Sequence, residues 1–267
     1  MSLLVRVRGH AATRQRGHAA QSDAATRLDE RIMNTVGRHR SDGRRREEEQ
    51  LLLEDARAEI AAACQNLRRD SLVVGTAGNV SVRVDDLVAI SPSGLDYADL
   101  TAELVGVHDL EGAVMEVALK PSSEIPLHLA VYARSDAAAV IHTHAPASSA
   151  LSTVVDEVPS SHYYTAMFGG SRQGAAAPYA TFGTPQLAEG VAAALRGRTA
   201  ARWATTVPSL SVRHWLSPAS GCPTWNTSAR CTLRALSTGL SGRTLPPEEC
   251  ALVAEQLSSY GQRAPQN

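Results

Sequence analysis

A chain of 267 residues, 43% of them hydrophobic, is long enough for one large domain or two small ones. Its formal net charge of −1 excludes a bulk electrostatic attraction to nucleic acid or to a membrane surface. No apolar run reaches the roughly eighteen residues that a membrane-spanning helix needs. We therefore expect neither nucleic acid nor a membrane among its partners.

Residues 1–46 are rich in arginine and poor in large apolar side chains. Hydrophobic periodicity is absent there, so we expect a disordered, solvated extension. The alternatives are an arm that touches nucleic acid, a transit peptide, or an upstream extension of a true start at Met33.

The N-terminus lacks the apolar core of a secretory signal. The four cysteines show no metal-type spacing; they are Cys64, Cys222, Cys231 and Cys250. Without a secretion signal, we expect reduced thiols and a cytoplasmic protein.

Helices and strands alternate from residue 47 to residue 200. A helix is expected within 47–69, a strand follows the turn GTAGN, and a second strand, LVAI, ends in the turn SPSG. A helix over 122–135, with Ser122 or Ser123 as its cap, precedes a buried strand at 137–145. Further helices are expected from Thr184 to Gly197 and over 245–261. This order predicts an α/β (α+β) domain over 47–267.

Residues 201–232 break this regularity. All three tryptophans lie there, and neither a helical nor a strand period persists.

Two histidines, His142 and His144, end the buried strand. Residues i and i+2 of a strand share a face, so both imidazoles can point into one pocket and bind Zn²⁺ or a similar ion. The alternative is a pair of strand histidines that face solvent or bond a neighbouring carbonyl.

Glu124 begins the helix that precedes this strand. A carboxylate there can be a third metal ligand or a general base, whereas the simpler interpretation is a first-turn glutamate that stabilises the helix dipole. Its neighbours Ser122 and Ser123 and the free N–H groups of a helix start favour an anion site.

Two further turns offer anion-binding groups. They contain Thr76 and Asn79 in GTAGN, and Ser93 and Gly94 in SPSG. Each turn alone is ordinary turn chemistry. Three of them beside a histidine pair favour a phosphorylated small substrate.

Together these motifs resemble the class II aldolase/adducin family. The resemblance runs from about Leu52 to Gly261, in the family's order, through GTAGNVSVR, ISPSGLDY, PSSEIPLHLAVY, AAVIHTHA, HYYTAMFGG and APYATFGTPQLAE. It is strongest to the branch that cleaves L-fuculose 1-phosphate.

The resemblance implies a zinc-dependent lyase with a three-layer α/β/α sandwich around a mostly antiparallel sheet. It also implies a homotetramer with sites at subunit interfaces. Zinc would be held by His142, His144, Glu124 and a third histidine further on. Glu124 and Tyr163 match catalytic positions, and the tyrosine would act across a subunit boundary. The implied phosphate site comprises Thr76, Asn79, Ser93, Gly94, Ser122 and Ser123.

The implied reaction cleaves a ketose 1-phosphate to dihydroxyacetone phosphate and an aldehyde. Lys120 is the only lysine, which disfavours a Schiff-base mechanism. One alternative is a pentulose-phosphate 4-epimerase or related lyase, although epimerases of the family tend to carry aspartate at position 124 and lack APYATFGT. Another is a non-catalytic adducin-like interaction module.

The expected third histidine is missing. Where the family has a His-Gly pair, this chain has ARWATTVPS. Read from the third base of the Thr205 codon, a shifted frame can encode His-Gly, with histidine near Thr206. The same frame, read from the Trp203 codon, gives Gly and then a codon that can be Asn, so the whole motif is Gly-Asn-His-Gly. We therefore hypothesise that about residues 202–232 are frameshifted and that the chain as written is impaired. In the alternative, the sequence is genuine and His214 replaces the ligand.

Overall fold

The central sheet has eight strands in the order β5-β4-β3-β2-β6-β1-β8-β7. The computed structural model describes residues 3–8, 51–169, 176–177, 180–203, 218–240 and 242–259. The strands are β1 (Leu3–Arg8), β2 (Asn79–Val84), β3 (Leu87–Ile90), β4 (Gly106–Asp109), β5 (Val114–Glu116), β6 (Ala137–Thr143), β7 (Ala176–Ala177) and β8 (Ala200–Trp203). Every pair is antiparallel except β7 and β8, which are parallel. The mostly antiparallel sheet is confirmed.

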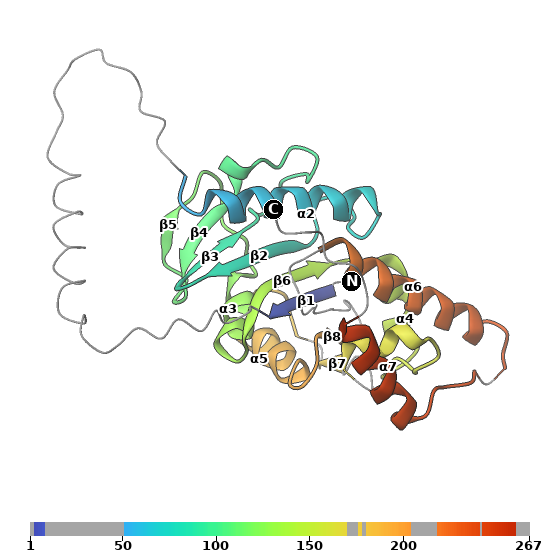
Figure 1. Cartoon of the computed structure of the whole chain (residues 1–267). Coiled ribbons are helices and arrows are strands. Elements are labelled where there is room, and N and C mark those ends of the chain that lie inside the picture. Colours follow the sequence, from blue (N-terminus) through green and yellow to red (C-terminus); the bar gives the residue numbers. More distant parts are fainter. Residues whose placement is uncertain are drawn as a thin grey trace, which may run out of the picture. The chain divides into compact units, whose positions relative to one another are not determined.

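Helices cover both faces of this sheet (Figure 1). Val80 and Val82 of β2 join a core cluster with α2 (Glu54–Arg69) and α6 (Pro218–Leu236). Val140 of β6 belongs to a second cluster with α3 (Ile125–Ala133) and α5 (Pro185–Ala194). Because alternate strand residues face opposite sides, the two clusters form the expected α/β/α layers.

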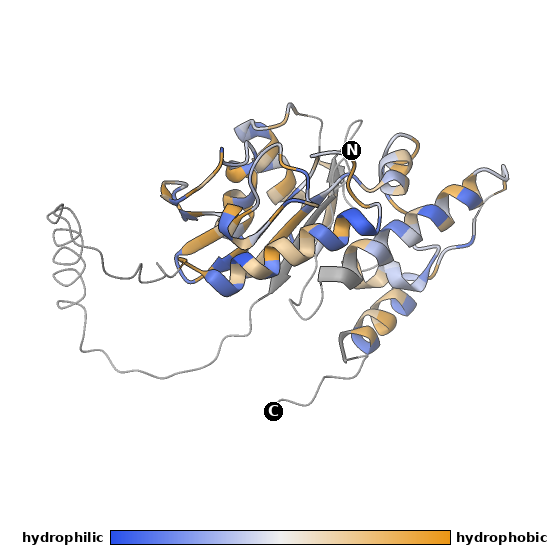
Figure 2. Cartoon of the chain, turned by 90° about the horizontal axis from the view of Figure 1, so that it is seen from above, coloured by the Kyte–Doolittle hydropathy of each residue, from blue (hydrophilic) through white to orange (hydrophobic). Residues whose placement is uncertain are grey.

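Local sequence explains the helices on each face. In α2, the buried residues Ile60, Ala63 and Leu67 recur at helical spacing, and Figure 2 shows hydrophobic and hydrophilic colours alternating along α2. The Thr184 side chain accepts a hydrogen bond from Leu187 N at 3.3 Å and caps α5, as the sequence predicts.

The pairing of β6 determines which way its histidine points. Its register with β1 shifts between Val7 and Arg8, and Ala137 and Ala139 consequently belong to different core clusters. Beyond this irregularity, Val140 faces α3 and α5. His142, two residues further along the strand, shares that face.

Strand β1 departs from the sequence analysis, which expected residues 1–46 to lack regular structure. Residues Leu3–Arg8 instead form a strand between β6 and β8. Residues 9–46, the rest of the arginine-rich extension, lie outside the described ranges. A strand in this place hydrogen-bonds on both sides, which a short alternating segment such as LLVRVR can do.

The irregular zone contains a helix that its sequence does not predict. Helix α6 has Pro223 in its interior, where proline removes one backbone hydrogen bond. The Trp225 ring is buried edge-on against Phe168, with ring centroids 5.1 Å apart. Within the described ranges, Trp225 Nε1 has no acceptor. Asn226 Oδ1, in contrast, accepts a hydrogen bond from Ala147 N at 3.2 Å.

Four further elements complete the fold. They are η1 (Ala102–Leu104), α4 (Pro146–Ser152), η2 (Tyr163–Phe168) and α7 (Pro247–Ser259). Among the helices that the structure describes, none combines the length and apolarity needed to cross a membrane.

Candidate active site

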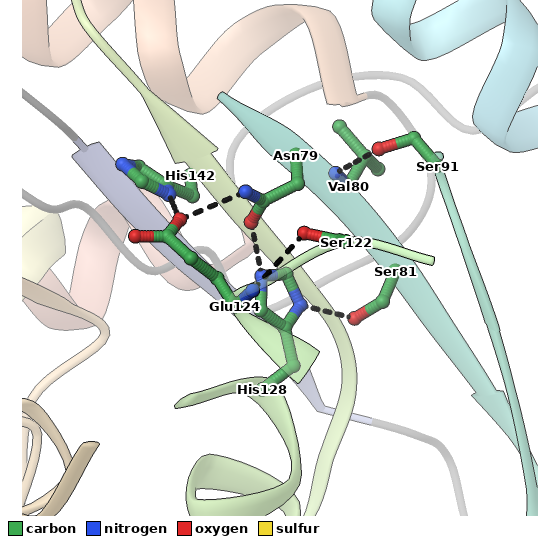
Figure 3. A network of polar contacts seen from close by, with 8 residues as sticks. All are labelled: Asn79, Val80, Ser81, Ser91, Ser122, Glu124, His128 and His142. Atoms are coloured by element: carbon green, nitrogen blue, oxygen red, sulfur yellow. Dashed lines mark hydrogen bonds and ion pairs between the residues drawn. The ribbon is translucent and has the colours of Figure 1, made fainter. Parts of the chain in front are cut away.

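The carboxylate of Glu124 contacts the imidazole of His142 through Oε2 and Nδ1 (Figure 3). Both side chains are buried, and Glu124 is only 7% exposed. Glu124 occupies the N-cap of α3, and not the first turn that the sequence predicted. Its side chain makes no capping hydrogen bond, and the Glu124 N–H donates to Ser122 Oγ at 3.2 Å. The carboxylate is therefore directed towards β6 and not to its own helix.

His144 lies one residue beyond the end of β6. Its ring stacks on that of His142, with centroids 5.2 Å apart and an angle of 27° between the planes. Burial, and then the neighbouring His142, lower the pKa of His144 to about 3. The structure thus places the two imidazoles side by side, and His144 is neutral at physiological pH, as a metal ligand must be.

Asn79 is the second partner of Glu124. Asn79 and His142 are register partners on β2 and β6, and Asn79 Nδ2 donates to Glu124 Oε2 at 2.8 Å. Burial raises the pKa of Glu124, but the interactions with His142 and the hydrogen bond from Asn79 outweigh it and lower the pKa to about 2. The carboxylate is consequently ionised at neutral pH.

His128 joins this network, although the sequence did not single it out as a site residue. It is fully buried, and its Nε2 lies 2.5 Å from Asn79 Oδ1. Its Nδ1 lies 2.6 Å from Ser81 Oγ, which is in turn 2.7 Å from Tyr132 Oη. The spacing of Glu124, His128 and Tyr132 at i, i+4 and i+8 is the sequence signal that could have revealed them.

The three predicted anion-binding turns lie close to this network. Ser93 N donates to Lys120 O at 3.1 Å, which joins the SPSG turn to the segment before α3. Gly78 of GTAGN has a φ of +95°, and a Cβ there would lie 2.7 Å from the carbonyl oxygen of His142. The exposed members of the predicted phosphate site are Thr76, Ser93, Gly94 and Ser123, whereas Asn79 and Ser122 are buried.

Tyr163 lies in η2 and is 44% exposed. Its ring stacks on that of His162 with centroids 4.9 Å apart, and it lies tilted by 39° against the ring of Tyr164 with centroids 4.2 Å apart. Its predicted catalytic role stays a prediction.

Three side chains of this site are of the types that bind divalent cations. Glu124 and His142 bring a carboxylate and an imidazole together, with the His144 imidazole beside them. These donor types bind Zn²⁺ and similar ions. Within the described ranges, no group of three His, Cys, Asp or Glu side chains has the arrangement of a complete metal site. Thr206 and His214, where the third ligand was sought, lie outside these ranges.

Comparisons with known proteins agree with this geometry. Residues 58–206 match the family described as Class II Aldolase and Adducin N-terminal domain. The L-fuculose phosphate aldolase of Escherichia coli (strain K12) is 37% identical over 211 residues, which cover 77% of this chain and 95% of that protein. The 5-deoxy-D-ribulose 1-phosphate aldolase of Bacillus thuringiensis serovar kurstaki is 42% identical over 142 residues, which cover 52% of this chain and 66% of that protein.

A solved structure of an L-fuculose 1-phosphate aldolase has the same fold. It superposes with a TM-score of 0.73 at 32% identity and covers 78% of this chain and 98% of its own. Sequence motifs, buried site and fold therefore agree, and this chain is a member of the class II aldolase and adducin family.

Proposed function

We propose that this chain is a metal-dependent aldolase that cleaves a ketose 1-phosphate of the L-fuculose 1-phosphate type to dihydroxyacetone phosphate and an aldehyde. The observation that carries the proposal is the buried, ionised Glu124 in contact with His142 beside His144. The aldolases among its relatives support the reaction class.

We further propose that Zn²⁺ is the cofactor and that His142, His144 and Glu124 hold it. Class II aldolases generally depend on a metal. When bound, such a cation supplies Lewis-acid stabilisation of the negative charge that carbon–carbon cleavage leaves on the ketone fragment. Neutral imidazoles and a carboxylate are the donors that zinc prefers, which supports this assignment.

In the proposed reaction, Glu124 transfers the proton at the reacting carbon. The C4 hydroxyl of the sugar loses its proton, the C3–C4 bond breaks, and its electrons remain on the ketone fragment, which is then protonated at carbon. Because the carboxylate is ionised at neutral pH, it first takes up the proton that the C4 hydroxyl releases and then delivers it to this carbon; in the reverse reaction it removes that proton. Asn79 holds the Oε2 atom of the carboxylate and thereby limits its orientation.

The three turns are proposed to bind the substrate phosphate. Exposed hydroxyl and backbone N–H groups of small residues suit a dianion. The proposed contacts are Thr76, Asn79, Ser93, Gly94, Ser122 and Ser123.

Tyr163 is proposed to exchange a proton with the oxygen that becomes the aldehyde. Its exposed ring is compatible with a role across a subunit boundary, as in a homotetramer. The cytoplasm is the proposed compartment.

The frameshift hypothesis has structural support. Pro223 lies inside α6, where proline removes a backbone hydrogen bond, and Trp225 buries its Nε1 without an acceptor among the described residues. Neither residue type suits its position. Asn226, which accepts from the first turn of α4, suits its place. We propose that the chain as written lacks one metal ligand and has reduced activity.

The test is dihydroxyacetone phosphate release from L-fuculose 1-phosphate and 5-deoxyribulose 1-phosphate by the full chain with added Zn²⁺. Release of both products in equal amounts supports the proposal. Conversion of a pentulose phosphate to its epimer without aldehyde would favour the epimerase, and the absence of any turnover and of metal binding would favour an adducin-like module.

A further inference from the structure

Helix α3 and strand β2 interleave their polar side chains in one buried row (Figure 3). Glu124, His128 and Tyr132 are four residues apart and lie on one side of α3. Asn79 and Ser81 are two residues apart and share a face of β2. The hydrogen bonds alternate between the two elements, from Glu124 to Asn79, His128, Ser81 and finally Tyr132.

The Asn79 amide determines the direction of the first two hydrogen bonds. An amide nitrogen can only donate, and Asn79 Nδ2 points at Glu124 Oε2 at 2.8 Å. Asn79 Oδ1 then faces His128 and needs a donor. His128 Nε2 must therefore carry the proton that it donates across 2.5 Å.

The directions of the remaining hydrogen bonds follow from the number of protons that each group can donate. With its proton on Nε2, a neutral His128 presents Nδ1 as an acceptor, so the Ser81 hydroxyl donates to it. Since Ser81 has only one proton, the Tyr132 hydroxyl must donate to Ser81 Oγ. All four donors in the row consequently point towards Glu124.

All members of the row are buried, and this burial fixes the direction of the hydrogen bonds between them. His128 and Ser81 are fully buried, and Asn79 and Tyr132 are nearly so. A buried polar group without a partner is destabilising, so rotation of one member would leave others unsatisfied. Hydrogen bonds in such a chain also polarise one another. The two contacts of Glu124 described above, with Asn79 and His142, both involve Oε2.

From this arrangement we infer that His128 is a positioning residue that acts through Asn79 to hold the Glu124 carboxylate in its reactive orientation. The inference rests on the proposed aldolase function. His128 touches no reacting atom; its protonated Nε2 fixes the Asn79 amide, and the amide fixes Glu124.

The test compares two substitutions of His128 in the full chain. His128→Leu removes both ring nitrogens and should lower kcat about 100-fold, because a misplaced catalytic group has an effect of that size, while KM stays within about threefold. His128→Gln keeps an amide donor towards Asn79 and should restore kcat to within about fivefold of the original chain. His108→Leu is the matched control, since His108 is equally buried on β4, which is not adjacent to β2.

A double-mutant cycle shows whether the effect passes through Asn79. If it does, His128→Leu has no further effect on kcat in an Asn79→Leu background. Additive effects of the two substitutions would overturn the inference. An equal loss of kcat in His128→Leu and His108→Leu would also overturn it, because both losses would then reflect stability.

A spectroscopic readout is independent of turnover. In the chain labelled with ¹⁵N-histidine, two-bond ¹H–¹⁵N correlations should show His128 as the neutral Nε2–H tautomer, assigned by its absence in His128→Gln. If a chain with aldolase turnover shows His128 as the Nδ1–H tautomer or as an imidazolium, the positioning role of His128 is wrong while the proposed function stands. A chain that shows no aldolase turnover would instead overturn the proposed function, and the positioning role with it.

Discussion

Asn79 and His142 are register partners on the neighbouring strands β2 and β6, and both side chains contact the same carboxylate oxygen, Oε2 of Glu124. The carboxylate comes from a different element, the N-cap of α3. Three segments of the chain thus converge on one oxygen atom. This convergence makes the site sensitive to changes in side-chain charge and in backbone position.

Removal of the Glu124 charge should abolish most of the aldolase activity. Glu124→Gln keeps the shape of the side chain and an acceptor for Asn79, but it removes the proton-transferring carboxylate. We expect kcat to fall about 100-fold or more in a dihydroxyacetone phosphate release assay. Glu111→Gln, in an exposed turn between β4 and β5, is the matched control and should retain full activity. Activity of Glu124→Gln within a few-fold of the original chain would contradict the assigned role.

Removal of the metal should have a similar effect. Dialysis against a chelator is expected to abolish turnover, and added Zn²⁺ should restore it. His142→Ala should lower the zinc bound per chain, as measured by elemental analysis, because it removes a ligand. His214→Ala should leave the zinc content unchanged if His214 does not replace the third ligand. A loss of zinc in His214→Ala would identify it as that ligand.

Gly78 should tolerate no side chain. A Cβ at this position would lie 2.7 Å from His142 O, and the φ of +95° disfavours any other residue. We expect Gly78→Ala to lower the free energy of unfolding by about 2 kcal/mol, measured by urea denaturation. Gly75→Ala is the control, because Gly75 also has a positive φ but no atom within 4 Å of an added Cβ. Its expected effect is smaller, about 1 kcal/mol, and equal effects would argue against crowding at His142.

His128 should make the folded state sensitive to acid. Burial, and then the interaction with His142, lower its pKa from the usual 6.5 to about 3, although Glu124 acts in the opposite direction. Between these pH values the unfolded chain binds a proton that the folded chain does not, so stability falls as the pH decreases through this window. The contribution of one such group is about 1.4 kcal/mol per pH unit.

Urea midpoints at pH 7 and pH 5 measure this effect. The decrease between the two values should be smaller in His128→Gln than in the original chain, since glutamine does not titrate. An identical decrease in both chains would show that His128 does not carry the acid sensitivity.

Resequencing of the gene tests the frameshift hypothesis. We expect the bases of codons 205–207 to encode His-Gly in the shifted frame, with cytosine at the third base of the Thr205 codon. Glycine after this histidine requires guanine at the third base of the Thr206 codon. Any other base at either position would exclude His-Gly and contradict the hypothesis.

Much of the fold could be predicted from local signals. The periodicity of α2, the Thr184 cap of α5 and the apolar run of β6 each depend on residues close in sequence. Strand β1 could not be predicted, because its pairing partners lie on β6 and β8, far along the chain. Helix α6 could not be predicted either, since Pro223 opposes it and only its packing in the fold supports it.

Local sequence patterns specify the kinds of groups at the site: a histidine pair at i and i+2, a carboxylate at a helix start and three turns of small polar residues. Those features depend on local spacing and were sufficient to indicate the family. Long-range contacts, in contrast, place Asn79, 45 residues from Glu124, against its carboxylate and His128 against Asn79. Strand register and helix placement bring these groups together, and both result from packing of the whole sheet, which no local pattern encodes.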